Sequence, residues 1–322
     1  MRRLRLVALA LAVTVLMLLL GPFLVPVPPL PCTTSPQGLA DADSVFVPVG
    51  NLQVHATIAG SGEPTLVVLH GFADSTFSWQ EAIAALDDRS TVVAFDRPGF
   101  GLTSGPLWPF RDANPYTPEA QANLTVALME ALGIERAVLV GHSAGGAIAA
   151  LVALSHPERV EALVLEAPAV EANLAPTWVQ WLARTPQGRY LGPLAARALP
   201  LSAPLLIRLA WHDPGSVTAE ELVGYARAFQ LCHWDRALWE HVAAGNPPNI
   251  VDRLDALRVP ILLVTGDDDR VVPTAATVRL ADALQDARLV VARGCGHVAH
   301  EECTETFVRA VTTFLDDLDI AP

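Results

Sequence analysis

The chain has 322 residues and is acidic, with 21 Lys and Arg against 34 Asp and Glu and a formal net charge of −13 at pH 7. The length is sufficient for one domain with a large core and an insertion. The acidic balance argues against a nucleic-acid partner, and the composition does not indicate an oligomeric state.

The first segment is an apolar run behind a basic start. Arg2, Arg3 and Arg5 precede residues 6–27, which are apolar apart from Thr14 and a Gly-Pro pair. As a helix this run would span about 33 Å, enough to cross a bilayer core of about 30 Å. Basic residues before the run, and none directly after it, place the N-terminus in the cytoplasm. We predict that residues 1–27 are a single-pass membrane anchor, with the rest of the chain outside the cell membrane. The alternative is secretion after signal-peptide cleavage, although no small-x-small cleavage motif follows directly.

A Pro-rich linker, residues 28–44, should hold the following domain, residues 45–318, off the membrane. In an oxidising compartment four cysteines allow three full pairings. Because they are scattered along the sequence, we expect them to be buried free thiols: Cys32, Cys232, Cys295 and Cys303.

From residue 45 onward, strand-like segments alternate with helical ones. This alternation predicts an α/β fold with a mostly parallel, doubly wound sheet. Two segments read as an antiparallel edge (45–49 and 53–58), and five read as buried strands (65–69, 137–140, 162–165, 260–265 and 288–292).

The strand at residues 137–140 runs into Gly141-His142-Ser143-Ala144-Gly145, and a small-residue helical stretch follows. A strand, a Gly-x-Ser-x-Gly turn and a helix describe a nucleophile elbow. In such a turn the serine hydroxyl is exposed at a helix N-terminus, where the helix dipole favours a developing anion.

Two later strands also end in polar residues. The strand at 260–265 leads to Asp267, Asp268 and Asp269, and the strand at 288–292 leads to His297. The order serine, acid, histidine is that of the α/β-hydrolase fold, and differs from the orders in chymotrypsin and subtilisin.

With these motifs the chain resembles the α/β-hydrolase superfamily over residues 45–318. His70-Gly71-Phe72 is similar to its oxyanion loop, and residues 96–103 are similar to its Asp-x-x-Gly-x-Gly turn. Residues 266–273 look like its acid loop, an alignment that selects Asp269.

The resemblance implies a catalytic triad of Ser143, Asp269 and His297. Asp267 and Asp268 are the fallback acids, and Glu166 holds a rarer position for the acid. The oxyanion would be bound by the backbone N–H groups of Phe72 and Ala144. The implied reaction is acyl transfer to water through an acyl-serine, with no metal and no cofactor.

Three other histidines lie near these motifs in the sequence. In this family, residues such as His70 and His142 orient loops rather than react. We expect His300 to be exposed to solvent.

The strand–helix alternation stops between residues 168 and 249, where the family has its substrate-selecting cap. The segment is helical in pattern, and it supplies the candidate substrate-binding side chains Trp178, Trp181, Trp211 and Trp234. The hydrophobic stretch 199–211 has Arg208 as its only charge. We therefore expect an apolar ester as substrate. We further expect this stretch to border the substrate entrance and to touch the membrane, which would admit lipid-like esters.

Other branches of the superfamily fit less well. Haloalkane dehalogenases and most epoxide hydrolases use an aspartate where this chain has Ser143. The meta-cleavage-product hydrolases, which break carbon–carbon bonds, share the serine triad but usually have Asn at the position of His142. A non-catalytic receptor of this fold would usually lack part of the triad.

Overall fold

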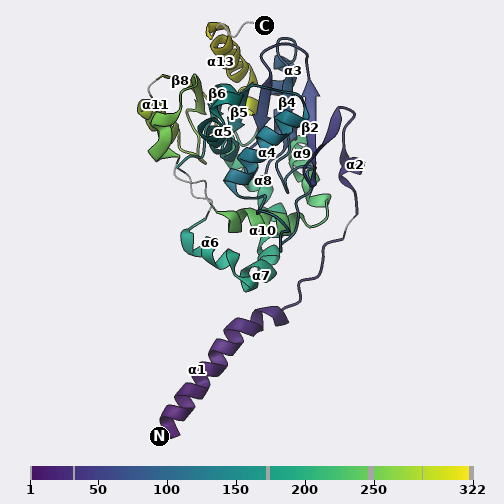
Figure 1. Ribbon diagram of the computed structural model, residues 1–322, viewed down its shortest axis with the longest axis vertical. Coiled ribbons are helices and arrows are strands. Elements are labelled where there is room, and N and C mark those ends of the chain that lie inside the picture. Colours follow the sequence, from purple (N-terminus) through teal and green to yellow (C-terminus); the bar gives the residue numbers. More distant parts are fainter. Residues whose placement is uncertain (1, 32, 172–174, 246–249, 285, 319–322) are drawn as a thin grey trace.

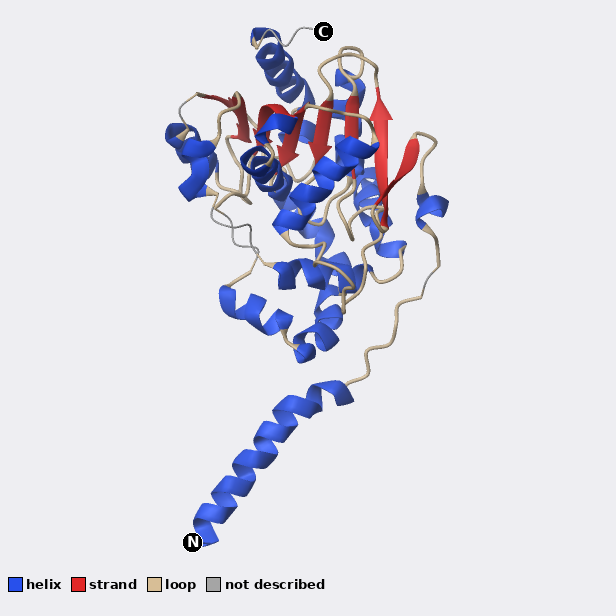
Figure 2. Ribbon diagram, in the orientation of Figure 1, coloured by secondary structure: helices blue, strands red, loops and turns tan. Residues whose placement is uncertain are grey.

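The computed structural model describes residues 2–31, 33–171, 175–245, 250–284 and 286–318. These residues form an α/β-hydrolase fold around an eight-stranded sheet, in the order β1-β2-β4-β3-β5-β6-β7-β8, with helices on both faces (Figure 2). The strands are β1 (Ser44–Val49), β2 (Leu52–Ala59), β3 (Leu66–Leu69), β4 (Val92–Phe95), β5 (Ala137–His142), β6 (Val160–Glu166), β7 (Ile261–Gly266) and β8 (Ala287–Ala292). β1 and β2 are antiparallel to their neighbours, and the other pairs are parallel. The predicted fold class is confirmed.

The central strands are buried on both faces, as expected of parallel strands covered by helices. Val67 and Leu69 point into one apolar cluster, whereas Leu66 and Val68 point into the other, because side chains alternate along a strand. One face is covered by α4 (Pro118–Ala131), α5 (Ala144–Ser155) and α11 (Thr274–Ala283), and the other by α3 (Gln80–Leu86), α12 (Ala299–Glu302) and α13 (Thr304–Asp317).

Between β6 and β7 the chain leaves the sheet and forms what we call the cap helices. They are α6 (Thr177–Arg184), α7 (Pro186–Ala196), α8 (Leu199–Ala210), α9 (Ala219–Ala226) and α10 (Trp234–Ala244). α6, α7 and α10 pack on one another on the side of the sheet nearest the N-terminal helix (Figure 1). The cap helices lie within the predicted insertion 168–249, of which residues 172–174 and 246–249 are outside the described residues.

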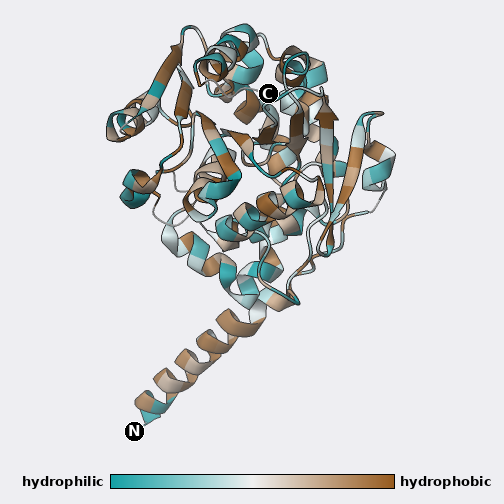
Figure 3. Ribbon diagram, turned by 45° about the horizontal axis from the view of Figure 1, so that its top comes forward, coloured by the Kyte–Doolittle hydropathy of each residue, from teal (hydrophilic) through white to brown (hydrophobic). Residues whose placement is uncertain are grey.

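The N-terminal helix α1 (Arg2–Leu20) projects away from the sheet and continues into a short 3₁₀ turn at Gly21–Leu24. It is apolar along its length, with hydrophilic residues gathered at its N-terminal end (Figure 3). Its length and composition suffice for a membrane span, and equally for a signal sequence. In the described part of the predicted linker that follows, residues 36–39 form a short helix, α2 (Pro36–Leu39).

Candidate active site

Ser143 lies at the turn between β5 and α5. Its backbone has φ 52° and ψ −118°, a region that side-chain-bearing residues rarely adopt. The turn can be this tight because its glycines have no Cβ: one on Gly145 would lie 2.1 Å from the carbonyl oxygen of Leu69. The Ser143 N–H donates to the Glu166 carbonyl (2.9 Å), which fixes the elbow to β6. The hydroxyl is therefore held at the N-terminus of α5, where free N–H groups meet the positive end of the helix dipole.

The predicted acid and histidine come together at the same edge of the sheet. His297 Nδ1 lies 2.8 Å from Asp269 Oδ2, and both residues are buried. The other oxygen of Asp269 accepts the N–H groups of Val271 and Val272, which orients the carboxylate. His297 Nε2 is then the ring nitrogen left for Ser143, which borders the same cavity.

The fallback acids have other partners. Asp267 accepts the N–H of Gly294, and Asp268 forms an exposed ion pair with Arg270. Of the three adjacent aspartates, Asp269 alone contacts His297 among the described contacts. The structure thus favours the alignment that selected Asp269.

The loop after β3 holds one peptide unit in a defined orientation. The Gly71 carbonyl lies 2.8 Å from His70 Nδ1 and accepts a bond from Arg97 Nη2 at 2.5 Å. Burial, together with the neighbouring Arg97, lowers the pKa of His70 to about 3, so its ring is neutral at pH 7. Because a trans peptide points its N–H opposite to its carbonyl, anchoring the Gly71 carbonyl directs the Phe72 N–H the other way. Gly71, Phe72 and Ala144 all border the cavity that contains Ser143.

That cavity has a volume of about 470 Å³ and is mostly apolar. α8 contributes a large part of its wall, and the remainder comes from the loops that carry the triad residues, from the loop after β3, and from Tyr225 and Phe229. The lining residues from α8 and its C-terminal end are Leu199, Ala203, Leu206, Ile207, Leu209, Ala210 and Trp211.

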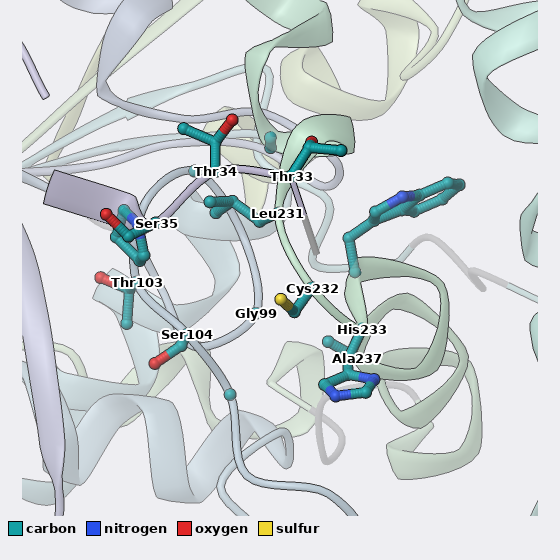
Figure 4. A pocket seen from close by; sticks show the side chains of 15 residues that line it. Thr33, Thr34, Ser35, Gly99, Thr103, Ser104, Leu231, Cys232, His233 and Ala237 are labelled. Atoms are coloured by element: carbon teal, nitrogen blue, oxygen red, sulfur yellow. The ribbon is translucent and has the colours of Figure 1, made fainter. Parts of the chain in front are cut away.

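The four candidate tryptophans are separated by the fold. Trp211 borders the Ser143 cavity. Trp234 instead borders a second cavity of about 420 Å³, between the linker, residues 99–105 and the start of α10 (Figure 4). Trp178 and Trp181 are 67% and 70% exposed on α6. Only Trp211 is thus positioned to contact a substrate at Ser143 among these four.

Sequence reasoning missed a buried ionic cluster behind the elbow. We expected an exposed His300, but it is fully buried, stacks on Trp79 and forms an ion pair with Glu166 at 2.8 Å. Glu301 and Asp74 also face this imidazole, as does the ring of His142. Burial opposes the charge, but Glu166 raises the pKa of His300 to about 9. Glu166 at a strand end is the available signal, but its sequence position indicates only an alternative acid for His297.

Glu166 joins the elbow to the loop that carries His297. Its backbone carbonyl accepts the Ser143 N–H, and its side chain accepts the His300 N–H at 3.0 Å. His142 makes a further link, because its Nε2 lies 3.1 Å from the His297 carbonyl oxygen. Burial, with His297 and His300 nearby, keeps the pKa of His142 well below its ordinary value, so this ring is neutral.

Replacing Glu166 with Gln should lower the free energy of unfolding by about 3 kcal/mol at pH 7, because the buried imidazolium loses its partner. Because the pKa of His300 is raised in the folded protein, its contribution to the free energy of unfolding is complete below about pH 6.5. This contribution is lost as the pH rises through about 9. Urea denaturation between pH 7 and 10 should therefore show a weaker pH dependence in Glu166→Gln than in the wild type.

The matched control is Glu171→Gln, which removes an exposed ion pair with Arg279. Glu171→Gln should lower the free energy of unfolding by less than about 1 kcal/mol. Equal losses in the two variants would contradict the role given to the Glu166–His300 pair.

The expectation of free thiols was wrong, because none of the described cysteines is free and Cys232 is also disulfide-bonded. Cys295 and Cys303, with Cα atoms 6.2 Å apart, form a disulfide that closes the loop containing His297 and His300. The eight-residue separation in sequence does not by itself indicate this pairing, because the two Cα atoms come within 6.2 Å only in the folded loop. A structural disulfide is typical of proteins outside the cytoplasm.

Comparison with known proteins agrees with this architecture. Residues 64–303 match the alpha/beta hydrolase fold family. The uncharacterized hydrolase YugF of Bacillus subtilis is 28% identical over 79% of this chain and 90% of its own length. A 2-hydroxy-6-oxo-6-phenylhexa-2,4-dienoate hydrolase of Comamonas testosteroni is 30% identical over 81% of this chain and 91% of its own. Among solved structures, a bacterial membrane phospholipase A superposes with a TM-score of 0.70 at 26% identity and covers both chains completely.

The chain therefore belongs to the α/β-hydrolase fold family, and it is a hydrolase of that fold.

Proposed function

We propose that this hydrolase cleaves carboxylic esters through an acyl intermediate on Ser143. The observation that carries the proposal is the strained, positive-φ serine at a helix N-terminus, in one cavity with a histidine paired to a buried aspartate. This arrangement supplies a nucleophile, a general base and a group that orients the base.

In the proposed reaction the Ser143 Oγ attacks the acyl carbon while His297 Nε2 takes its proton. The oxyanion accepts hydrogen bonds from the Phe72 and Ala144 N–H groups, and His297 then returns the proton to the departing alcohol. A water molecule, deprotonated by the same histidine, releases the acid and restores Ser143. These steps need no metal ion and no organic cofactor. Asp269 holds the tautomer of His297 and stabilises the imidazolium.

The cavity supports an apolar substrate. Leucine, isoleucine and tryptophan side chains from α8 and its end form much of its wall. Such a surface gains free energy by removing an acyl chain from water, by about 0.8 kcal/mol for each buried CH₂. A structural neighbour that covers the whole chain is a membrane phospholipase A, which is consistent with a lipid-like ester.

Carbon–carbon bond hydrolysis is the second candidate. It is supported by relatives such as the Comamonas testosteroni enzyme named above. His142, where those hydrolases usually carry Asn, and the apolar N-terminal helix favour the ester reading.

For location, the proposal is that α1 remains as a single membrane span with its basic end in the cytoplasm. The hydrolase domain would then be outside, in agreement with the Cys295–Cys303 disulfide. Secretion after cleavage of α1 is the alternative, and the length of the N-terminus on the purified native protein distinguishes the two.

The first test uses the full chain in detergent, with a fluorophosphonate probe and p-nitrophenyl esters of increasing acyl length. We expect the probe to modify Ser143, as located by peptide mass spectrometry, and turnover to rise with chain length until the cavity is filled. A folded protein that neither reacts nor turns over would overturn the proposal. Labelling without ester turnover would favour the carbon–carbon reading, which a 2-hydroxy-6-oxo-dienoate substrate would then test.

A further inference from the structure

The cap helices expose far more apolar surface than their neighbours in the fold. On α8, Leu201 and Leu205 are 86% and 71% exposed, and none of the twelve residues of this helix is buried. On α6, Trp178, Trp181 and Leu182 are exposed at positions i, i+3 and i+4, so they share one side of the helix. An apolar surface of this kind on a soluble domain marks a site of interaction.

α8 also forms the rim of the Ser143 cavity. Leu206 and Leu209 both border the cavity and are 47% and 45% exposed at its edge. Leu201 and Leu205 do not border the cavity and continue the apolar surface outward from that rim. A ligand that contacts the outer side of α8 is therefore adjacent to the opening of the cavity.

The charge of residues 172–212, which include α6, α7 and α8, is unlike that of the chain as a whole. Between Glu171 and Asp213 there is no acidic residue, whereas four arginines occur: Arg184, Arg189, Arg197 and Arg208. Arg189 and Arg197 are paired with acidic residues of α10. Arg184 donates to two backbone carbonyls, and no carboxylate pairs with its charge among the described contacts. In a protein with a net charge of −13, this segment suits contact with an anionic surface.

The end of α1 is attached to the same part of the molecule. Gln187 on α7 donates to the Leu19 carbonyl (3.0 Å), and the Tyr190 hydroxyl donates to the Val25 carbonyl (3.1 Å). The rings of Phe23 and Tyr190 are in contact, with centroids 5.2 Å apart. A bilayer crossed by α1 would therefore have its surface next to α7, on the cap side of the sheet (Figure 1).

We propose that the exposed sides of α6 and α8 lie in the interface of the bilayer that α1 crosses, and that the ester enters the Ser143 cavity from the bilayer over the rim of α8. The partner is a lipid surface with anionic headgroups. Tryptophan is favoured at the headgroup level, where Trp178 and Trp181 would lie, and leucines suit the acyl boundary just below. The entry of an ester into the cavity rests on the ester hydrolysis proposed above. The contact of α6 and α8 with the bilayer does not depend on that proposal.

The contact is tested without using activity. The full chain is reconstituted in phosphatidylcholine–phosphatidylglycerol vesicles that carry brominated acyl chains, which quench nearby tryptophan emission. We expect a Trp178→Phe/Trp181→Phe variant to lose most of the quenching seen in the wild type. Equal fractional quenching in both proteins would overturn the bilayer contact, even if the enzyme proves to be an esterase.

The route of entry is tested by comparing a bilayer-resident phospholipid with soluble p-nitrophenyl butyrate in the same vesicles. Leu201→Glu/Leu205→Glu should reduce hydrolysis of the phospholipid about tenfold or more, because two large apolar contacts with the lipid are lost, and should leave the soluble ester unaffected. Val223→Glu, at a 67% exposed position on α9, is the matched control and should change neither rate. Equal losses on both substrates would contradict entry over α8.

The oligomeric state of the same variant in detergent is compared with that of the wild type by analytical ultracentrifugation. A difference between Leu201→Glu/Leu205→Glu and the wild type would show that a second copy of the chain covers α8, and would also overturn the proposal.

Discussion

We expect the Ser143→Ala variant to keep its fold and to lose ester turnover by a factor of about 10⁶ in kcat. Without the hydroxyl there is no acyl acceptor, and His297 has no proton to remove. The residual rate should exceed the rate in water, because the N–H groups of Phe72 and Ala144 still stabilise an oxyanion. Steady-state kinetics with a short p-nitrophenyl ester and the full chain in detergent measure the loss.

The elbow provides an internal control for this result. Alanine has the same Cβ as serine at φ 52°, so Ser143→Ala should retain the backbone strain and unfold at nearly the same urea concentration. Ser143→Gly removes that Cβ and should raise the free energy of unfolding by about 1 kcal/mol while being equally inactive. Substantial turnover in either variant would show that Ser143 is not the nucleophile.

The elbow and the polar residues that follow each strand could be predicted from the sequence for a geometric reason. Parallel strands end at the same edge of a sheet, so polar residues that follow β3, β5, β7 and β8 must meet there. The glycines beside Ser143 and the aspartates after residue 266 form motifs that are specific enough to assign the site residues by number. The predicted strands agree with the structure to within about two residues at their ends.

The buried cluster behind the elbow could not be found in this way. His300 lies three residues after His297 and is followed by Glu301 and Glu302, a sequence typical of the start of a surface helix. It is buried because α12 turns inward and stacks the imidazole on Trp79, which is more than two hundred residues away in sequence. Neither the stacking nor the pairing with Glu166 has a local signature.

In the cap, too, some features could be predicted from the sequence and others could not. Its helical character and its place after β6 followed from the sequence, but the direction in which each tryptophan points did not. Trp178 and Trp181 occur in an apolar pattern that a packed core would also produce, yet the structure exposes both. Side-chain direction in a short amphipathic helix depends on which neighbour covers it, and a bilayer as neighbour leaves the same pattern as a protein core.

The Asp269→Asn variant should lower kcat by about 10⁴-fold with little change in stability. The carboxylate accepts a hydrogen bond from His297 Nδ1–H, whereas an amide can present its NH₂ group to the same nitrogen and so hold the ring in the tautomer that cannot accept a proton from Ser143. The neighbouring aspartates are matched controls. Asp268→Asn weakens exposed pairs with Arg270 and His212, each worth at most about 1 kcal/mol, and Asp267→Asn weakens one bond to the Gly294 N–H. Both should keep kcat near the wild-type value on a soluble ester. If Asp267→Asn or Asp268→Asn were as inactive as Asp269→Asn, the acid would be misassigned. The loss must be specific to Asp269, because only this carboxylate is both buried against the His297 ring and fixed by two backbone N–H groups.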